Sequence, residues 1–254
     1  MTELPSGPDG EVLRFVANMN ALQMDQLSAL LADRGEADGD AARSARELVA
    51  RWRAIGLAET ENLTVGEPWV WASRTGLDAC GFHTRTVRPK ANGLRHTHAV
   101  IDVRLALERT AEFRDGGARW RSERSIMTSL GYPARPVHIP DGEVRWPADG
   151  AAAPADEIWA IEVELSSKAI ERTAAIMREV LTCSGGWDKV PPSRALPGVA
   201  PRYARLVYIC SARTVSGTLN ARAEVGSPLS ARIDVYDLPQ SALSLNASRR
   251  GWRA

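Results

Sequence analysis

Cysteine is scarce in this sequence: only three of 254 residues are cysteines, and they lie far apart, at Cys80, Cys183 and Cys210. An odd number of widely spaced cysteines argues against a disulfide framework and against a zinc site. Long apolar runs are also missing, since none approaches the roughly 18 residues that a membrane span needs. The first residues lack the basic start and apolar stretch of a signal peptide. We therefore expect a cytoplasmic protein with no membrane partner.

The chain also lacks an excess of charge of one sign, because 32 basic and 31 acidic side chains give a net charge of +1. The charges are unevenly distributed, however. Residues 1–40 are acidic, whereas residues 41–56, 82–95 and 241–254 are basic. Basic segments suit several contacts with nucleic-acid phosphates, and they equally suit ordinary solvated faces. Charge alone leaves both interpretations open.

The first 80 or so residues show three helical patterns. Apolar residues recur at helical spacing in Val12–Met19, in Met24–Leu31 and in Ala45–Ile55. We expect Asp40 to be the N-cap of the third helix, because a carboxylate there accepts free backbone N–H groups. Gly56 is expected to follow its C-terminal end, and Ile55 to belong to its buried stripe.

A hairpin is predicted after the third helix. Two short extended runs, Leu57–Thr64 and Trp69–Ala72, flank a turn that contains Gly66 and Pro68. Ser73 is expected to cap a short helix over Gly76–Cys80 after the hairpin. This order of elements resembles a winged helix-turn-helix, and we assign residues 1–81 to such a DNA-binding domain.

In a winged helix the third helix normally enters the major groove of DNA. Here Arg43, Arg46 and Arg53 share a face away from the apolar stripe, and the resemblance implies that they contact phosphates or base edges. The alternative is a protein-binding winged helix with solvated arginines. We interpret residues 82–95 as a basic linker that adds three further candidates for DNA contact: Arg85, Arg88 and Lys90.

The pattern changes from residue 96 onward. We expect a second domain over residues 96–240 and a basic tail over 241–254. The elements expected in it are a helix over His96–Arg109, strands over Arg119–Ile126, Val137–Val144 and Ile158–Leu165, a helix over Ser167–Leu181, a strand over Leu206–Cys210, a helix over 212–225 and a strand over Ala231–Tyr236. This alternation predicts an α/β domain with one mixed sheet.

The candidate chemistry lies on the strand around Glu162 and Glu164. Side chains alternate along a strand, so these two carboxylates share one face. Asp141 follows Pro140 at the end of the preceding run, and it falls beside Glu162 if the two strands pair. Three such carboxylates form an oxygen-rich site of the kind that Mg²⁺ or Mn²⁺ takes. The alternatives are an exposed strand and an ordinary Pro-Asp-Gly turn.

These segments resemble the PD-(D/E)XK nuclease fold, and more narrowly the bacterial replication-relaxation family, which joins a winged helix to such a domain. The resemblance spans nearly the whole chain, although each motif is short. The segments that carry it are His98–Val100, Leu105–Glu108, Trp120–Arg124, Pro140–Gly142 and Ile161–Glu164. The fold class that we predict is therefore a mixed-sheet, PD-(D/E)XK-like α/β domain preceded by a winged helix-turn-helix.

The resemblance also implies roles for individual residues. Asp141 and Glu162 fall on metal-ligand positions, and Glu123 and Glu108 match acidic positions that often complete the site. Glu164 stands where the PD-(D/E)XK pattern usually has lysine, whereas the replication-relaxation resemblance implies an acidic residue there, and we assign Glu164 as a ligand or water-positioning group. Lys168, at the start of the next helix, is the candidate for the missing catalytic cation, and its alternative is a solvated lysine.

The function that these residues suggest is DNA binding with Mg²⁺- or Mn²⁺-dependent phosphodiester cleavage, in plasmid or mobile-element replication or transfer. His138 is either a base or a structural histidine. Because glutamate replaces the usual lysine, the sequence does not decide whether the protein is an enzyme. A non-catalytic DNA-binding initiator, accessory or regulatory factor is the alternative. A protein-interaction adaptor is a third interpretation. DNA is the expected partner, and a homodimer is left open.

Overall fold

The structure, a computed structural model, describes residues 4–83, 88–130, 137–148, 156–185 and 200–238. The chain divides into two compact units, Met1–Leu105 and Ala106–Ala254. The described parts combine helices with a three-stranded antiparallel sheet and a five-stranded mixed sheet. The predicted α/β class with a mixed sheet is therefore confirmed.

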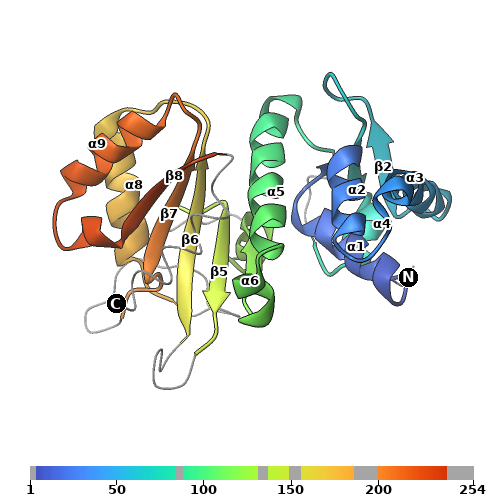
Figure 1. Ribbon diagram of the computed structural model, residues 1–254, viewed down its shortest axis with the longest axis horizontal. Helices are drawn as coiled ribbons and strands as arrows, with labels where there is room; N and C mark the ends of the chain where they lie inside the picture. Colours follow the sequence, from blue (N-terminus) through green and yellow to red (C-terminus); the bar gives the residue numbers. More distant parts are fainter. Residues whose placement is uncertain (1–3, 84–87, 131–136, 149–155, 186–199, 239–254) are drawn as a thin grey trace. The chain divides into compact units, whose positions relative to one another are not determined.

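The first unit begins with three helices and a small sheet (Figure 1). Strand β3 lies in the centre of this sheet and pairs antiparallel with β1 and β2. The two-residue strand β1 was not predicted, because so short a segment has no periodicity to detect. The elements in chain order are α1 (Pro8–Asn18), β1 (Leu22–Gln23), α2 (Met24–Ala32), α3 (Asp38–Ala54), β2 (Ala58–Glu61), β3 (Trp69–Ala72) and α4 (Arg74–Ala79).

Helix α3 corrects two predictions about its ends. It begins at Asp38 with Ala37 as its N-cap, so Asp40 lies inside the first turn and is not the cap. Ile55 is 55% exposed and does not belong to the buried stripe, whereas Trp52 is buried as predicted. Gly56 follows the end of the helix with φ of 72°, a left-handed conformation that glycine adopts without strain.

The hairpin of β2 and β3 carries the chain from α3 to α4. Trp69 and Trp71 of β3 are buried, so this strand anchors the sheet in the core of the unit. Ser73 caps α4 as predicted, because its side chain accepts a hydrogen bond from the N–H of Gly76. The helix begins at Arg74, two residues earlier than expected.

Helix α5 (Leu94–Glu108) follows a single 3₁₀ turn, η1 (Ala91–Gly93), and the division between the units falls inside it. Its first turns contact α2 through polar groups. The side chain of Gln26 donates to Asp102 Oδ1 at 2.6 Å and to the carbonyl of His98 at 3.0 Å. Asp102 in turn lies 3.0 Å from the His98 ring. These bonds fix the start of α5 within the first unit.

The second unit is built on the sheet β4-β5-β6-β7-β8. The first two pairings are antiparallel, and the pairings of β6 with β7 and of β7 with β8 are parallel. Each parallel pairing is bridged by a helix, α8 or α9. The elements are α6 (Ala111–Asp115), β4 (Arg119–Ser122), α7 (Glu123–Leu130), β5 (Gly142–Trp146), β6 (Glu157–Glu164), α8 (Ile170–Thr182), β7 (Arg205–Cys210), α9 (Val215–Val225), η2 (Leu229–Arg232) and β8 (Ile233–Asp237).

Several boundaries in this unit differ from the predictions, among them those of β4, β5 and α8. The run Arg119–Ile126 is a strand only to Ser122, whose hydroxyl accepts from the N–H of Ser125 and starts α7. Strand β5 begins at Gly142, five residues later than expected, because Pro140 has no N–H for a ladder. Helix α8 begins at Ile170, three residues later than expected.

The two faces of the sheet bury different cores. Helices α8 and α9 pack side by side along one face, where Met177 of α8 and Ala221 of α9 join the same apolar cluster (Figure 1). On the other face Trp146 and Trp159 are in ring contact, and Phe113 of α6 packs on Trp146. Because side chains alternate along β6, Glu162 and Glu164 face the side of α8 and α9.

Candidate functional site

Asp141 and Glu162 lie next to each other where β5 and β6 meet. The strands are antiparallel with Gly142 opposite Ile161, so the neighbouring positions 141 and 162 are also opposite. Asp141 Oδ2 accepts a hydrogen bond of 2.8 Å from the N–H of Val163. The carbonyl of Asp141 accepts a bond of 3.2 Å from the N–H of Glu123. The pairing that brings Asp141 beside Glu162 therefore forms. We call Asp141, Glu162 and Glu164 the carboxylate row, and Glu123 lies next to Asp141 at its edge.

Glu162 is buried and hydrogen-bonded to His138. Its side chain is 8% exposed, and Glu162 Oε1 lies 2.7 Å from His138 Nε2. Burial raises the pKa of Glu162 to about 7, and the charge of Asp141 acts in the same direction. His138 and Lys168 oppose this rise. Glu162 therefore changes its charge near neutral pH, which is unusual for a carboxylic acid.

The histidine responds to the same pair of acids. Burial lowers the pKa of His138, but the hydrogen bond to Glu162 and the charges of Glu162 and Asp141 outweigh this effect and raise it. About 29% of the His138 side chain is exposed, so the ring connects the buried carboxylate to solvent. This contact places His138 beside Glu162, whereas the sequence favoured a structural histidine over a base.

Glu164 is paired with Lys168. The ammonium nitrogen lies 2.5 Å from Glu164 Oε2, and the N–H of Ser166 donates to Glu164 Oε1 at 3.3 Å. Lys168 lies in the segment between β6 and α8 and not on the first turn of the helix as predicted. Its charge also lowers the pKa of Glu162. Lys168 thus reaches back to the end of β6 and supplies a cation among the carboxylates.

Tyr208, which the sequence analysis did not single out, lies next to Glu162 across the sheet. It is the partner of Glu162 in the parallel pairing of β6 with β7, and it is 2% exposed. Burial raises its pKa far above the ordinary value, and the charges of Glu162 and Glu164 add to the effect. A tyrosine between the apolar residues of a central strand was the available signal.

A second buried polar cluster lies two residue pairs further along the same strands, on the same face. Glu143 is fully buried, and Arg202 binds its two carboxylate oxygens at 2.7 and 2.8 Å. The hydroxyl of Tyr203 also donates to Glu143, and Arg121 lies 3.7 Å away. This cluster joins β4 and β5 to the segment that enters β7. It supports the carboxylate row without being open to a ligand.

Oxygen ligands at this site suit a hard cation. Mg²⁺ is commonly held by one or two carboxylates together with waters, and Asp141 with Glu162 matches that donor set. The Glu164 carboxylate is paired with the Lys168 ammonium in this arrangement. Over the residues that the structure describes, no three His, Cys, Asp or Glu side chains form a metal-binding group. The role of Glu108, half-buried at the end of α5, stays a prediction.

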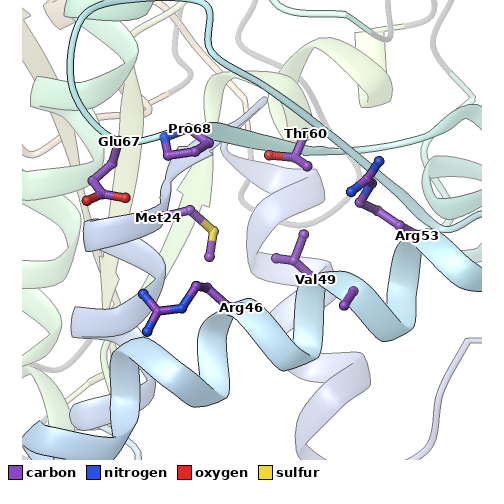
Figure 2. Close-up of a pocket in the computed structure, with 8 residues that line it drawn as sticks. Met24, Arg46, Val49, Arg53, Thr60, Glu67 and Pro68 are labelled. Carbon is purple, nitrogen blue, oxygen red and sulfur yellow. The ribbon is translucent and has the colours of Figure 1, made fainter.

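The first unit carries a groove of about 210 Å³ between α3 and the hairpin (Figure 2). Figure 2 shows Arg46 and Arg53 rising from α3 toward opposite ends of the groove, with Thr60 and Pro68 across from them. The remaining lining residues are Met24, Val49, Ala50 and Glu67. Its floor is therefore partly apolar, and its rim carries two cations.

The predicted DNA-binding residues fall into two groups. Arg43 pairs with Asp40 at 2.7 Å and with Glu47 at 3.9 Å, and Arg88 pairs with Glu61 at 2.7 Å. Arg46 and Arg53 have no ion-pair partner among the residues described in the structure, and Lys90 is exposed. Arg85 lies outside the described residues. The arginines of α3 that can offer their charge to DNA are therefore Arg46 and Arg53, which line the groove.

The fold and the site together define a two-unit α/β protein with a carboxylate row on one face of a mixed sheet. The description of the family whose model matches residues 13–179 is replication-relaxation. Because this match covers more than half of the chain, the protein belongs to the replication-relaxation family, as the resemblance predicted. Curated proteins and solved structures gave no match. Family membership connects the chain to replication and relaxation of DNA.

All three cysteines are free, with Cys183 and Cys210 buried and Cys80 partly so. No helix in the described ranges has the length and apolar character needed to cross a bilayer.

Proposed function

We propose that this protein binds DNA through its first unit and hydrolyses a phosphodiester bond at the carboxylate row of its second unit, with Mg²⁺ or Mn²⁺ as cofactor. Its setting would be the replication or transfer of a plasmid or mobile element in the cytoplasm. The observation that supports this most is the juxtaposition of Asp141 and Glu162 with the Lys168 ammonium. Asp141 and Glu162 on one sheet face, with the Lys168 ammonium paired to Glu164 at the end of β6, match the chemistry that the PD-(D/E)XK resemblance implies.

In this proposal the chain's own groups have separate roles. Asp141 and Glu162 would hold the cation, which when bound lowers the pKa of a water ligand and polarises the phosphodiester. Lys168 would stabilise the negative charge that develops on the phosphate oxygens. Glu164 holds Lys168 in place through their ion pair, and Glu123 would contribute an outer carboxylate next to Asp141.

The first unit would act as a winged helix on DNA. Its order of helices and strands is the winged-helix order, and α3 takes the position of the recognition helix. Arg46 and Arg53 lie seven residues apart on α3, so about two helical turns separate them on one side. Their free charges suit phosphates on the two sides of the groove.

A plasmid-nicking assay tests the proposal directly. Wild-type protein should convert supercoiled plasmid to the open-circular form with Mg²⁺ or Mn²⁺, and EDTA should stop the reaction. Asp141→Ala with Glu162→Ala should abolish nicking and leave duplex binding in a gel-shift assay nearly unchanged. Glu171→Ala, which removes an exposed carboxylate from the first turn of α8, is the matched control and should nick normally.

The second candidate is a DNA-binding initiator, accessory or regulatory factor without catalysis. One observation favours it: each acid of the row has a partner in the protein itself, since Glu162 binds His138, Glu164 binds Lys168 and Asp141 binds the N–H of Val163. Tight duplex binding without cleavage of supercoiled, linear or single-stranded DNA, with any divalent metal, would select this candidate.

A further inference from the structure

Tyr208 presents its side chain on the same sheet face as the carboxylate row. It is the direct partner of Glu162 in the parallel ladder, where both strands alternate in step, so the two side chains project to the same side. The ring is 2% exposed and belongs to the apolar cluster beneath α8. The charges of Glu162, Glu164 and Asp141 act on the Tyr208 side chain. The hydroxyl therefore lies at the boundary between the core and the site.

The hydroxyl of Tyr208 forms no hydrogen bond with another residue in the described ranges of the chain, and its oxygen is not fully buried. Glu162 is bonded to His138, and Glu164 is bonded to Lys168 and to the N–H of Ser166. A hydroxyl at the edge of the interior normally bonds to a protein group, to water or to a ligand, because an unsatisfied donor costs free energy, so the Tyr208 hydroxyl is available to water or to a ligand. The other fully buried tyrosine follows this rule, since Tyr203 donates to Glu143.

We propose that the Tyr208 hydroxyl is a ligand-binding donor of this site, and that it donates a hydrogen bond to a phosphate oxygen of bound DNA. The proposal rests on the proposed function, because it needs DNA at the carboxylate row. Carboxylates repel a phosphate, so a donor beside them is needed in addition to the Lys168 cation. A phenol is a neutral donor at working pH, and it adds no further charge to the buried row.

Tyr208→Phe separates this role from a structural one. The substitution removes only the hydroxyl, and that hydroxyl bonds to no described protein group, so the midpoint of urea unfolding should stay the same or rise. Tyr203→Phe removes the bond to buried Glu143 and should lower the midpoint. Nicking by Tyr208→Phe should fall about 10²-fold, the scale for losing one transition-state donor. Tyr236→Phe, in β8, is the control for removing a tyrosine hydroxyl outside the row and should nick normally.

A second measurement reports on binding without turnover. The chain has four tyrosines, so labelling with ¹³Cζ-tyrosine gives few signals, and the one that Tyr208→Phe removes is assigned to Tyr208. Adding a short DNA duplex with Ca²⁺ to the full chain should shift this signal, and adding Ca²⁺ alone should shift it less. The Tyr236 signal should stay in place.

The outcomes distinguish the two proposals. A wild-type protein that nicks DNA while Tyr208→Phe nicks equally well overturns the role of Tyr208 and leaves the nuclease intact. If the protein never nicks DNA but its Tyr208 signal shifts when duplex is added, the role of Tyr208 as a donor is supported and the proposed hydrolysis is overturned. A Tyr208 signal that ignores DNA, or a lowered midpoint in Tyr208→Phe, shows that the hydroxyl is structural.

Discussion

The Lys168 ammonium lies 2.5 Å from the Glu164 carboxylate, so the glutamate at the position where the PD-(D/E)XK resemblance implies a lysine is itself paired with a lysine four positions later. The pair joins the end of β6 to the segment before α8. Glu164 is 5% exposed and Lys168 side chain 33% exposed. The cation is therefore present at the row, but it comes from a different position in the sequence.

Replacing Lys168 tests whether this cation acts in cleavage. Lys168→Met keeps much of the aliphatic volume and removes the charge, so nicking should fall about 10²-fold. The free energy of unfolding should fall by about 1–2 kcal/mol, because Glu164 loses its partner while solvent still reaches the lysine side. Arg172→Met, on an exposed position of α8, is the control and should change neither quantity. Nicking equal to wild type in Lys168→Met would exclude the catalytic role.

The pKa shifts of Glu162 and His138 predict how stability depends on pH. The pKa of Glu162 is about 7 in the folded protein against an ordinary value of 4.5, so the folded state binds more protons than the unfolded state between these values. Stability therefore falls as pH rises from about 4.5 to 7. The raised pKa of His138 acts in the same direction, because its contribution is present below 6.5 and is lost above the folded value.

Glu162→Gln should flatten this dependence. The amide keeps a hydrogen bond with His138 and removes the buried charge, so the variant should be more stable than wild type at pH 8 by about 1–3 kcal/mol. At pH 4.5 the two should be nearly equal, because both side chains are neutral. Urea unfolding across this range measures the difference, with Glu179→Gln on the exposed side of α8 as control. Parallel curves for wild type and Glu162→Gln would contradict the raised pKa.

The groove predicts which arginines of α3 contact DNA. Arg46→Ala with Arg53→Ala should weaken duplex binding and lower the slope of log affinity against log salt by roughly two units, one for each lost phosphate contact. Arg43→Ala with Arg51→Ala removes the same charge from arginines that already pair with acids, and should change the slope less. Fluorescence anisotropy at several salt concentrations gives both slopes. Equal slopes for the two double variants would place the DNA-binding surface elsewhere.

The buried cluster around Glu143 predicts a large effect on stability. Glu143→Gln leaves the Arg202 guanidinium, 0% exposed, without its opposite charge, and the free energy of unfolding should fall by about 3–5 kcal/mol. Asp156→Asn breaks a pair with Arg145 in which both side chains are about one-third exposed, and should cost about 0–1 kcal/mol. Glu143→Leu combined with Arg202→Met should recover part of the loss. Similar losses for Glu143→Gln and Asp156→Asn would mean that the cluster is hydrated.

Periodicity predicted the long elements and failed at the short ones. Helices such as α2 and strands such as β6 follow from apolar spacing, since each buries one stripe or face. The run Arg119–Ile126 alternates like a strand, yet Ser122 caps α7 and turns the chain into a helix. A local capping bond outweighed the alternation there, and the serine was the signal to heed.

The site was predictable as far as strand pairing reaches. Alternation along β6 and the Pro-Asp step were enough to bring Asp141 beside Glu162. The contacts of His138 and Tyr208 depend on register with distant segments, which no local pattern specifies. The split of the α3 arginines depends on where single acids such as Asp40 lie. Contacts between residues far apart in the sequence could therefore not be predicted from local patterns.

Exchanging the charges of Glu164 and Lys168 tests whether the cation's position or its presence matters. Glu164→Lys alone restores the lysine that the PD-(D/E)XK resemblance implies, but it places two ammonium groups next to each other at a buried position. That variant should lose stability and nick more slowly than wild type. Glu164→Lys with Lys168→Glu restores an ion pair in reverse, so it should regain most of the lost stability and, with a lysine at the usual position, should nick at least as fast as the single variant. A double-mutant cycle on unfolding free energies and nicking rates measures the coupling. Faster nicking by Glu164→Lys alone than by wild type would identify Glu164 as the residue that silences a dormant nuclease, and would favour the non-catalytic candidate for the natural protein.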